Sequence, residues 1–269
     1  MSYINLNQVK NLSYLKWEKL DSGTSDGILN KNKAGNTYLK LASYNKYYGF
    51  YGREPLLELI NSRIGQILNL PVLDYGLWVA DVILDNTKYR TLVSTSKNYA
   101  LNKKVVSFER FFTNNRQNNE MPLEFVKRYN WKQFIYKQFI FDFIICNMDR
   151  HGKNNDILID DKKRLSVAPF FDNSLTFVTN RPDNDINQKV TYNDSLRTNN
   201  FIGSPYLIEN LYNIDETITL RSPKKDDRKE LFQGLGKVTT REFRDYVWWL
   251  LQERVKDVRK SGIRFIQWY

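Results

Sequence analysis

Apolar residues recur along this chain with two different spacings, which divide it into a strand-rich part and a helical part. Short apolar runs separated by glycine, asparagine and aspartate predict strands. These cover residues 12–20, 37–42, 76–84 and 89–95, and residues 28–29 lead into a predicted turn at 30–36. Between them, apolar positions 56, 57, 60, 64, 67 and 68 have helical spacing, with Pro55 and Pro71 near the two helix ends. We therefore expect a small antiparallel sheet of five strands with one helix over residues 1–97.

From residue 98 to residue 269 the pattern is mainly helical. Residues 97–104 predict a polar connector, and residues 173–206 have the polarity of a long loop. Helices are predicted over residues 107–114, 123–129, 131–146, 225–233, 240–256 and 261–268, and a strand hairpin over 157–159 and 165–168. The stretch 131–146 is apolar on nearly every face, which is typical of a buried helix. The predicted fold class is α+β, with a boundary between the two parts after residue 97.

Composition narrows the class of protein. The chain has 269 residues, of which 41% are hydrophobic, so it is long enough for one large domain or two lobes with their own cores. Its formal net charge is +11, but the lysines and arginines are spread along the chain, so direct nucleic-acid binding stays an open question. The chain start lacks the pattern of a signal peptide, and the apolar stretch 134–146 is too short and polar to span a membrane. We expect a cytoplasmic protein, with secretion as an effector left open.

The single cysteine and the single histidine argue against several kinds of site. With Cys146 alone the chain forms no internal disulfide, which fits a reducing compartment. Cys146 ends an apolar run, so we predict a buried small residue there rather than a nucleophile. His151 alone does not make a multi-histidine zinc site, and it disfavours a histidine-based triad. Asp142 lies inside an apolar stretch, where we expect it to accept hydrogen bonds from backbone or loop donors.

Three polar residues lie at the edges of apolar segments in the second half of the chain. They are Asp149, Asn154 and Asp172. In phosphoryl-transfer enzymes an aspartate on such a loop orients the nucleophile, while an asparagine and a second aspartate hold the metal. The spacing of Asp149 and Asn154 taken alone is more common in plain polar turns between buried segments, so it does not decide between the two interpretations.

The predicted strand 37–42 carries a lysine on a half-buried face. Alternation places Leu39 and Leu41 on one face and Lys40 on the other. A lysine in such a position needs an anionic partner, so Lys40 is a candidate for contact with phosphate. Its expected protein partner is a glutamate on the following helix. We favour Glu58, one turn inside the helix, over Glu54, whose place at the helix start suits the helix dipole.

One string of residues resembles the catalytic loop of the HipA-like serine/threonine kinases. It reads Asn147-Met-Asp149-Arg150-His151-Gly-Lys-Asn154 and is followed by Pro169-Phe-Phe-Asp172. That family's loop reads Asn-x-Asp-Arg-His-x-x-Asn, and its metal-binding aspartate follows a proline and an aromatic residue. The resemblance runs from about residue 22 to residue 172. It implies a bilobal protein-kinase-like fold that uses ATP and Mg²⁺.

The resemblance also implies roles for individual residues. Asp149 would be the catalytic base, Asn154 and Asp172 the Mg²⁺ ligands, and His151 a structural support. Lys40 and Glu58 would align the nucleotide phosphates.

A glycine-containing loop over residues 21–27 lies between two predicted strands, where its backbone N–H groups can contact phosphates. By resemblance, Ser22, Gly23, Thr24 and Ser25 would contact the nucleotide, and a serine of this loop would be autophosphorylated. Asp26 departs from that expectation, because an acid beside phosphates is repelled unless it points away.

The resemblance further implies partners. A serine or threonine of a protein would be the substrate, and some short members of the family are toxins paired with an antitoxin, while others act as secreted or effector kinases. Two alternatives stay open: a kinase of the same fold that acts on a lipid or small molecule, and a non-catalytic protein that binds nucleotides or nucleic acid.

Overall fold

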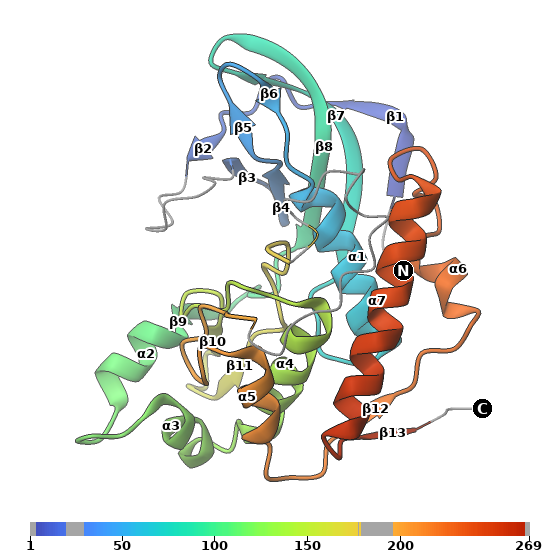
Figure 1. Ribbon diagram of the computed structural model, residues 1–269. Helices are drawn as coiled ribbons and strands as arrows, with labels where there is room; N and C mark the ends of the chain where they lie inside the picture. Colours follow the sequence, from blue (N-terminus) through green and yellow to red (C-terminus); the bar gives the residue numbers. More distant parts are fainter. Residues whose placement is uncertain (1–3, 20–29, 177, 179–195, 267–269) are drawn as a thin grey trace.

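The computed structural model describes residues 4–19, 30–176, 178 and 196–266. Figure 1 shows a sheet at one end of the molecule, helix α1 (Glu54–Ile67) beneath it, and most of the other helices toward the opposite end. Among the described residues, none of the helices has the length and apolar character that a membrane-spanning segment needs.

The main sheet has six strands within the described residues, in the order β1-β7-β8-β4-β3-β2. These strands are β1 (Ile4–Asn11), β2 (Glu18–Lys19), β3 (Asn30–Ala34), β4 (Thr37–Leu41), β7 (Tyr75–Leu84) and β8 (Thr87–Lys97). Strand β1 runs parallel to β7, while the other neighbours are antiparallel. A short hairpin, β5 (Tyr44–Asn45) and β6 (Gly49–Phe50), precedes α1.

The rest of the described chain is mainly helical. Its helices are α2 (Phe108–Asn115), α3 (Pro122–Arg128), α4 (Lys132–Ile145), α5 (Leu207–Tyr212), α6 (Asp227–Leu231) and α7 (Arg241–Lys260). Strands β9 (Lys104–Ser107), β10 (Asp156–Ile159) and β11 (Leu165–Val167) form a small antiparallel sheet. Strands β12 (Thr219–Arg221) and β13 (Arg264–Ile266) pair in parallel.

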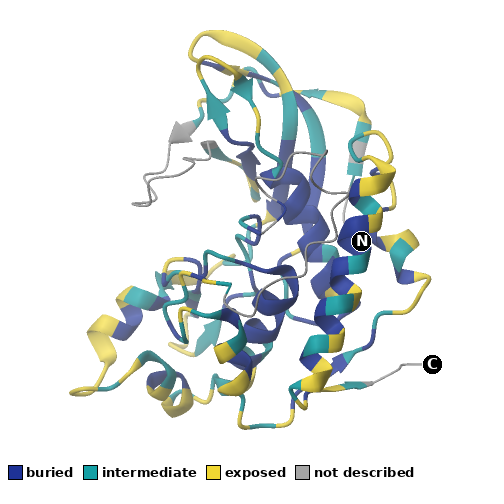
Figure 2. Ribbon diagram, in the orientation of Figure 1, coloured by how far each residue is buried: buried dark blue, intermediate teal, exposed yellow. Residues whose placement is uncertain are grey.

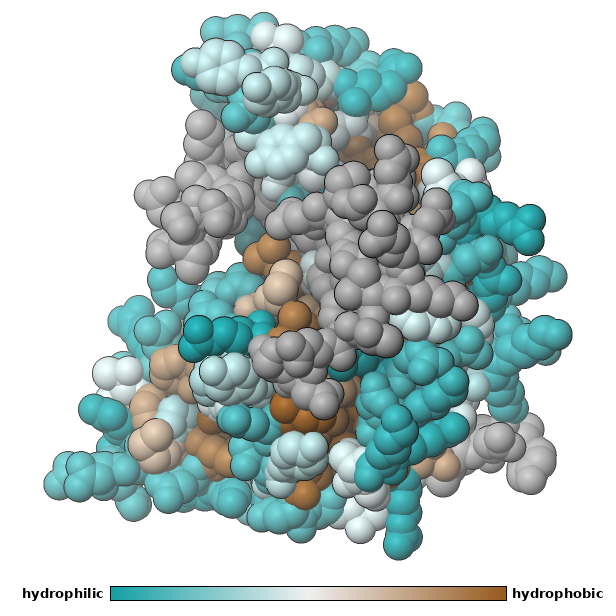
Figure 3. Space-filling view, viewed as in Figure 1, coloured by the Kyte–Doolittle hydropathy of each residue, from teal (hydrophilic) through white to brown (hydrophobic). Residues whose placement is uncertain are grey.

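Two clusters of buried apolar side chains support these elements. The larger extends over α1, α4 and α7, and the smaller lies against the six-stranded sheet. Helix α4 is buried on nearly every side because its sequence is almost continuously apolar, and Figure 2 shows both α1 and α4 as largely buried. Helix α7 instead buries one side, and Figure 3 shows mostly hydrophilic side chains over its lower part.

Most predicted elements match the structure, and the predicted α+β class is confirmed. The predicted helix after residue 52, the strands at 37–42, 76–84 and 89–95, and the buried helix at 131–146 correspond to α1, β4, β7, β8 and α4. The boundary between residues 1–97 and 98–269 stays a prediction, although β8 ends at Lys97.

Three predicted elements are wrong. The strand expected at 12–20 is not formed over residues 12–17, because Leu15 donates its N–H to the Leu12 carbonyl and closes a turn, while the strand lies earlier, at β1. Residues 30–34 form β3 rather than a turn, since their polar side chains belong to a partly exposed strand. The helix expected at 261–268 is replaced by β13, because α7 ends before Gly262, whose φ of 92° is incompatible with a continuing helix. The hairpin of β5 and β6, strand β9, helix α5 and strand β12 were not predicted.

Packing at Gly65 gives a first testable prediction. A Cβ atom added to Gly65 in α1 would lie 2.2 Å from Cγ1 of Val72. Gly65→Ala should therefore lower the free energy of unfolding by about 1–3 kcal/mol through overpacking, although alanine normally favours a helix. Urea denaturation measures this change. The matched control is Gly236→Ala, whose Cβ meets nothing within 4 Å; equal stability of the two variants would contradict the packing argument.

Candidate active site

A buried ion pair holds the loop of residues 147–154. The Arg150 guanidinium is fully buried, and its Nη2 lies 2.7 Å from Oδ1 of Asp142, in the last turn of α4. The Asn147 side chain donates to the same carboxylate at 3.0 Å and accepts the N–H of Asp149 at 3.1 Å. Burial works against the charge of Arg150, but Asp142 raises the pKa of Arg150 above its ordinary value. The expectation that Asp142 accepts bonds from loop donors is confirmed.

The same guanidinium also reaches the segment around Asp172. Nη1 of Arg150 donates to the Phe171 carbonyl at 2.9 Å, and Nη2 donates to Oδ1 of Asn173 at 2.6 Å. Since Phe171 and Asn173 flank Asp172 in the sequence, Arg150 fixes the position of this aspartate relative to the loop.

Asp149 and Asn154 are brought together on that loop. The Asn154 side-chain N–H donates to the backbone carbonyl of Asp149 at 2.8 Å, which leaves the amide oxygen for a ligand. The Asp149 carboxylate is partly exposed, with Nδ2 of Asn199 at 3.4 Å and Nε2 of His151 at 3.7 Å. Asp149 is thus oriented by its neighbours and still accessible to a substrate.

Lys40 joins two carboxylates that come from distant parts of the chain. Its Nζ lies 2.8 Å from Oε1 of Glu58 and donates a second, short hydrogen bond to Asp172. The other oxygen of Glu58 accepts the backbone N–H of Asn173 at 2.9 Å. Glu54 instead accepts hydrogen bonds from Ser43, so Glu58 rather than Glu54 is the partner of Lys40.

Charges within this group control one another. Burial lowers the tendency of Lys40 to stay charged, but Asp172 and Glu58 together raise its pKa above the usual value. Burial also opposes the charge of Asp172, yet Lys40 and Lys31 hold the pKa of Asp172 well below its usual range. For Glu58, burial prevails and raises the pKa. Asp172 is therefore the more firmly ionised of the two carboxyl groups.

The backbone of Asp172 has an unusual conformation. Its φ is 55°, in the left-handed region, which aspartate tolerates better than most residues. The backbone N–H of Asp172 donates to the Tyr75 hydroxyl at 3.2 Å, and Nζ of Lys31 lies 3.7 Å from its carboxylate. The turned backbone allows this carboxylate to face both lysines.

Lys40 and Asp172 line a cavity of about 520 Å³, which also contains Tyr99, Asp156 and Phe171 in its wall. The Tyr99 ring stacks on Phe171 with centroids 5.4 Å apart, and its hydroxyl donates to Asp156 at 2.6 Å. Burial raises the pKa of both Tyr99 and Asp156. The volume is typical of small-molecule sites. The wall combines lysine side chains, which suit phosphate groups, with an aromatic surface, which suits a nucleobase.

The fold has a clear counterpart among solved structures. The proinflammatory kinase CtkA from Helicobacter pylori superimposes with a TM-score of 0.58 at 14% identity, over 94% of this chain and 98% of CtkA. The chain has a protein-kinase-like fold. The resemblance to HipA-like kinases that the loop sequence indicates is thereby confirmed at the level of the fold.

A weaker likeness is to the toxin HipA from Shewanella oneidensis, solved with HipB and its operator DNA. The TM-score is 0.43 at 14% identity, over 88% of this chain and 57% of that one. No protein-family model and no curated protein sequence matches the chain.

The donor set of this kinase fold suits a hard cation that is shared with phosphates. Asn154 and Asp172 offer an amide oxygen and a carboxylate, which are the donor types that Mg²⁺ prefers. In the part of the chain that the structure describes, no group of three or more acidic, histidine or cysteine side chains could hold a metal ion by itself. Mg²⁺ commonly completes its coordination with water and nucleotide phosphates, so these two residues fit it.

Most of the residues predicted to form the site lie together. Lys40, Glu58 and Asp172 are in contact, and Asp149 and Asn154 share one loop. Ser22, Gly23, Thr24 and Ser25 lie outside the described residues, so their predicted nucleotide contacts stay untested. Cys146 is buried, and burial raises the pKa of its thiol, in agreement with the expected structural role.

The polar residues of the cavity wall that sequence reasoning missed include Lys31, Tyr99 and Asp156. Lys31 lies in a segment expected to be a turn, and Tyr99 in a segment expected to be a plain connector. Asp156 had a usable signal, because it follows Asn154 by two positions at the start of an apolar strand.

The buried ion pair gives a prediction for stability. Asp142→Asn keeps the side-chain volume but leaves the Arg150 charge uncompensated, so the free energy of unfolding should fall by about 3–5 kcal/mol. Urea denaturation followed by circular dichroism measures the loss. Asp257→Asn is the control, because Asp257 forms an exposed pair with Lys260 at 2.9 Å and should cost less than about 1 kcal/mol. If both variants lose about the same free energy of unfolding, burial does not account for the contribution of the ion pair between Asp142 and Arg150.

Proposed function

We propose that this protein transfers the terminal phosphoryl group of ATP to a serine or threonine of a protein, with Mg²⁺ as cofactor. The observation that carries the proposal is the position of Lys40, which bonds to both Glu58 and Asp172 at the wall of a nucleotide-sized cavity. Asp149 and Asn154, on the adjoining loop, complete the set of groups that phosphoryl transfer needs.

Each residue would have a distinct task. Lys40 would bind the phosphates, and Glu58 would hold its ammonium group in place. Asn154 and Asp172 would hold Mg²⁺, which when bound offsets negative charge on the phosphates. Asp149 would orient the attacking hydroxyl and accept its proton. Most of the rate enhancement would come from positioning and from stabilisation of charge.

The arrangement also suggests how the nucleotide lies. Two lysines of the cavity wall, Lys31 and Lys40, lie at Asp172 and would face the phosphates, which leaves the aromatic pair Tyr99 and Phe171 for the adenine base. A cytoplasmic location stays a prediction from the sequence pattern, and an antitoxin partner stays a prediction from the sequence resemblance.

Phosphoryl transfer from γ-labelled ATP tests the proposed function. Asp149→Asn and Asp172→Asn should each lower incorporation of label into protein by about 100-fold or more, because one loses the base and the other a metal ligand. The matched control is Asp161→Asn, an exposed aspartate in the turn between β10 and β11, which should leave the rate unchanged.

Removal of Mg²⁺ with a chelator should abolish the wild-type signal. If wild-type protein binds ATP but labels no protein, including itself and a cell lysate, the assignment as a protein kinase is wrong. Label on small molecules or lipids of the lysate would instead favour a kinase with that class of substrate.

Autophosphorylation of the loop at residues 21–27 is a separate prediction. Incubation with ATP and Mg²⁺ should add one phosphoryl group or more to the intact mass, and replacement of Ser22 and Ser25 by alanine should remove that increase. Asp149→Asn protein should also show no increase, which separates autophosphorylation from modification by a contaminating kinase. An unchanged mass of active wild-type protein would exclude this form of regulation.

A further inference from the structure

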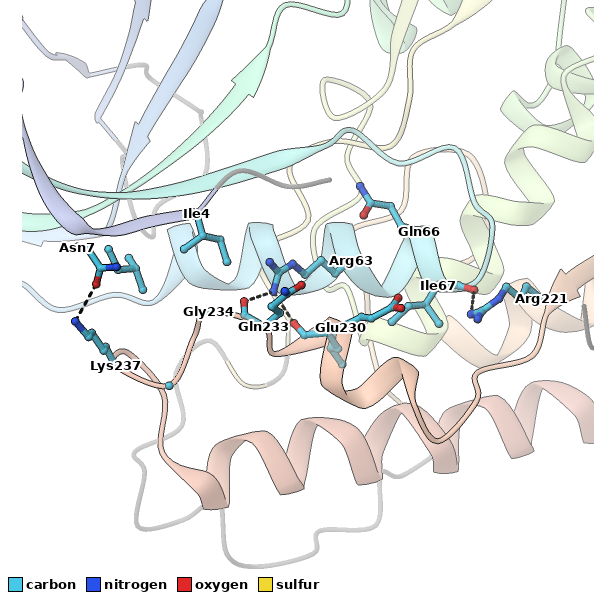
Figure 4. Close-up of a pocket in the computed structure, with 13 residues that line it drawn as sticks. Ile4, Asn7, Arg63, Gln66, Ile67, Arg221, Glu230, Gln233, Gly234 and Lys237 are labelled. Atoms are coloured by element: carbon cyan, nitrogen blue, oxygen red, sulfur yellow. Dashed lines mark hydrogen bonds between the residues drawn. The ribbon is translucent and has the colours of Figure 1, made fainter. Parts of the chain in front are cut away.

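A second cavity lies against helix α1, away from the residues that contact Lys40. Its volume is about 830 Å³, and it is lined by residues of β1, of α1 and of the segment 230–237, together with Arg221 of β12. Figure 4 shows Arg63 pointing from α1 toward that segment, with Asn7 and Lys237 at one end of the cavity and Arg221 at the other. We call it the rear cavity.

The rear cavity and the ATP site use different faces of the same helix. Successive residues of an α-helix are rotated by about 100°, so the five positions from Glu58 to Arg63 place the two side chains about 140° apart. Glu58 contacts Lys40, and Arg63 lines the rear cavity. A ligand in the rear cavity would therefore contact the helix that positions Glu58.

Arg63 gives the rear cavity its chemical preference. Nη1 of Arg63 donates to the carbonyls of Leu231 and Gln233, each at 2.9 Å. Partial burial lowers the pKa of Arg63, and the nearby charge of Asp74 offsets only part of this effect. A partly buried guanidinium that is held by neutral carbonyls gains from an added anion, since five donors allow it to bind more than one oxygen.

The other charged groups concentrate this preference at one end. Arg221 is already neutralised by Asp227, at 2.7 Å, and the charge of Glu230 acts on the same arginine. At the opposite end Lys237 donates to the neutral side chain of Asn7 at 2.9 Å. In the part of the chain that the structure describes, the positive charge without an ion pair thus lies between Arg63, where Asp74 offsets part of it, and Lys237.

Apolar side chains form the remaining part of the wall at this end. Ile4 and Leu6 of β1 and Leu231 also line the cavity, and a further apolar residue, Ile67, lies beside Arg221 in Figure 4. In Figure 4, Ile4 lies between Arg63 and the pair of Asn7 and Lys237. A suitable ligand therefore needs an apolar body as well as an anionic group.

We propose that the rear cavity binds a small amphipathic anion, with its carboxylate, sulfonate or phosphate on Arg63 and its apolar body against Ile4 and Leu6. Binding would hold α1 in the position in which Glu58 bonds to Lys40, and so raise the affinity for nucleotide. Only this second effect rests on the proposed kinase function; binding in the rear cavity does not depend on it.

The probe for the test is anilinonaphthalene sulfonate, which combines an aromatic body with one sulfonate and fluoresces in apolar surroundings. It is titrated into the folded full-length protein with and without a saturating non-hydrolysable ATP analogue and Mg²⁺. We expect saturable binding that nucleotide does not displace. By thermodynamic reciprocity, nucleotide should tighten probe binding by the same factor by which the probe tightens nucleotide binding, about fivefold or more.

Two sets of variants locate the probe. Arg63→Gln should weaken its binding about tenfold or more, because a charge-assisted hydrogen bond is lost, whereas Lys256→Gln on the exposed side of α7 should not.

Because Arg63 also holds the segment 230–237, Gly236 provides a test that removes no contact. A Cβ atom at Gly236 meets nothing within 4 Å, and Gly236→Asp and Gly236→Asn have side chains of the same size that differ in charge. The aspartate variant should bind the probe about threefold more weakly than the asparagine variant.

Three outcomes would overturn the inference. Displacement of the probe by nucleotide would place it in the ATP site, and equal affinities for the two Gly236 variants would place it elsewhere on the surface. Probe binding in the rear cavity without any mutual effect on nucleotide would exclude the regulatory role. Failure of the protein to bind nucleotide at all would instead contradict the proposed function and leave the Arg63 and Gly236 comparisons valid.

Discussion

The charge of Arg150 is the constraint on which the site depends. A guanidinium without solvent contact must be neutralised and fully hydrogen-bonded, or the fold loses several kcal/mol. Asp142 supplies the negative charge that neutralises Arg150. The Phe171 carbonyl and the Asn173 side chain accept further hydrogen bonds from its guanidinium group. Satisfying one buried cation thus brings the end of α4, the loop 147–154 and the segment at Asp172 to fixed relative positions.

The charges around Lys40 are less evenly matched than those around Arg150. Two carboxyl groups, Glu58 and Asp172, share one buried lysine, and burial raises the pKa of Glu58 while Lys40 and Lys31 lower that of Asp172. Under the proposed function, nucleotide phosphates would compete with Asp172 for Lys40, and the Asp172 carboxylate would then be available to a cation.

Where a local rule applied, sequence patterns predicted the fold and selected residues that the structure brings into contact. Lys40 and Glu58 were found because alternation in a strand and spacing in a helix place each on a definite face. The loop residues Asp149 and Asn154 were found from an ordered string. The predictions were wrong where tertiary pairing decided the structure: polar residues 30–34 become a strand only because β4 pairs with them, and residues 264–266 only because β12 does. Tyr99 and Asp156 meet across more than fifty positions, and no local pattern indicates such a contact.

The contact between Asn7 and Lys237 has a consequence for how the molecule is made. These residues are separated by 230 positions, and the packing of Ile4 against Gly234 is of the same kind. The end of α1 similarly receives its hydrogen bonds from Arg221, far along the chain. During synthesis β1 and the helix with Glu58 therefore wait for contacts with segments that emerge from the ribosome much later. A nascent chain that has reached Asp172 already contains the candidate site residues but still lacks these contacts to α1, so the order of synthesis delays assembly of the site.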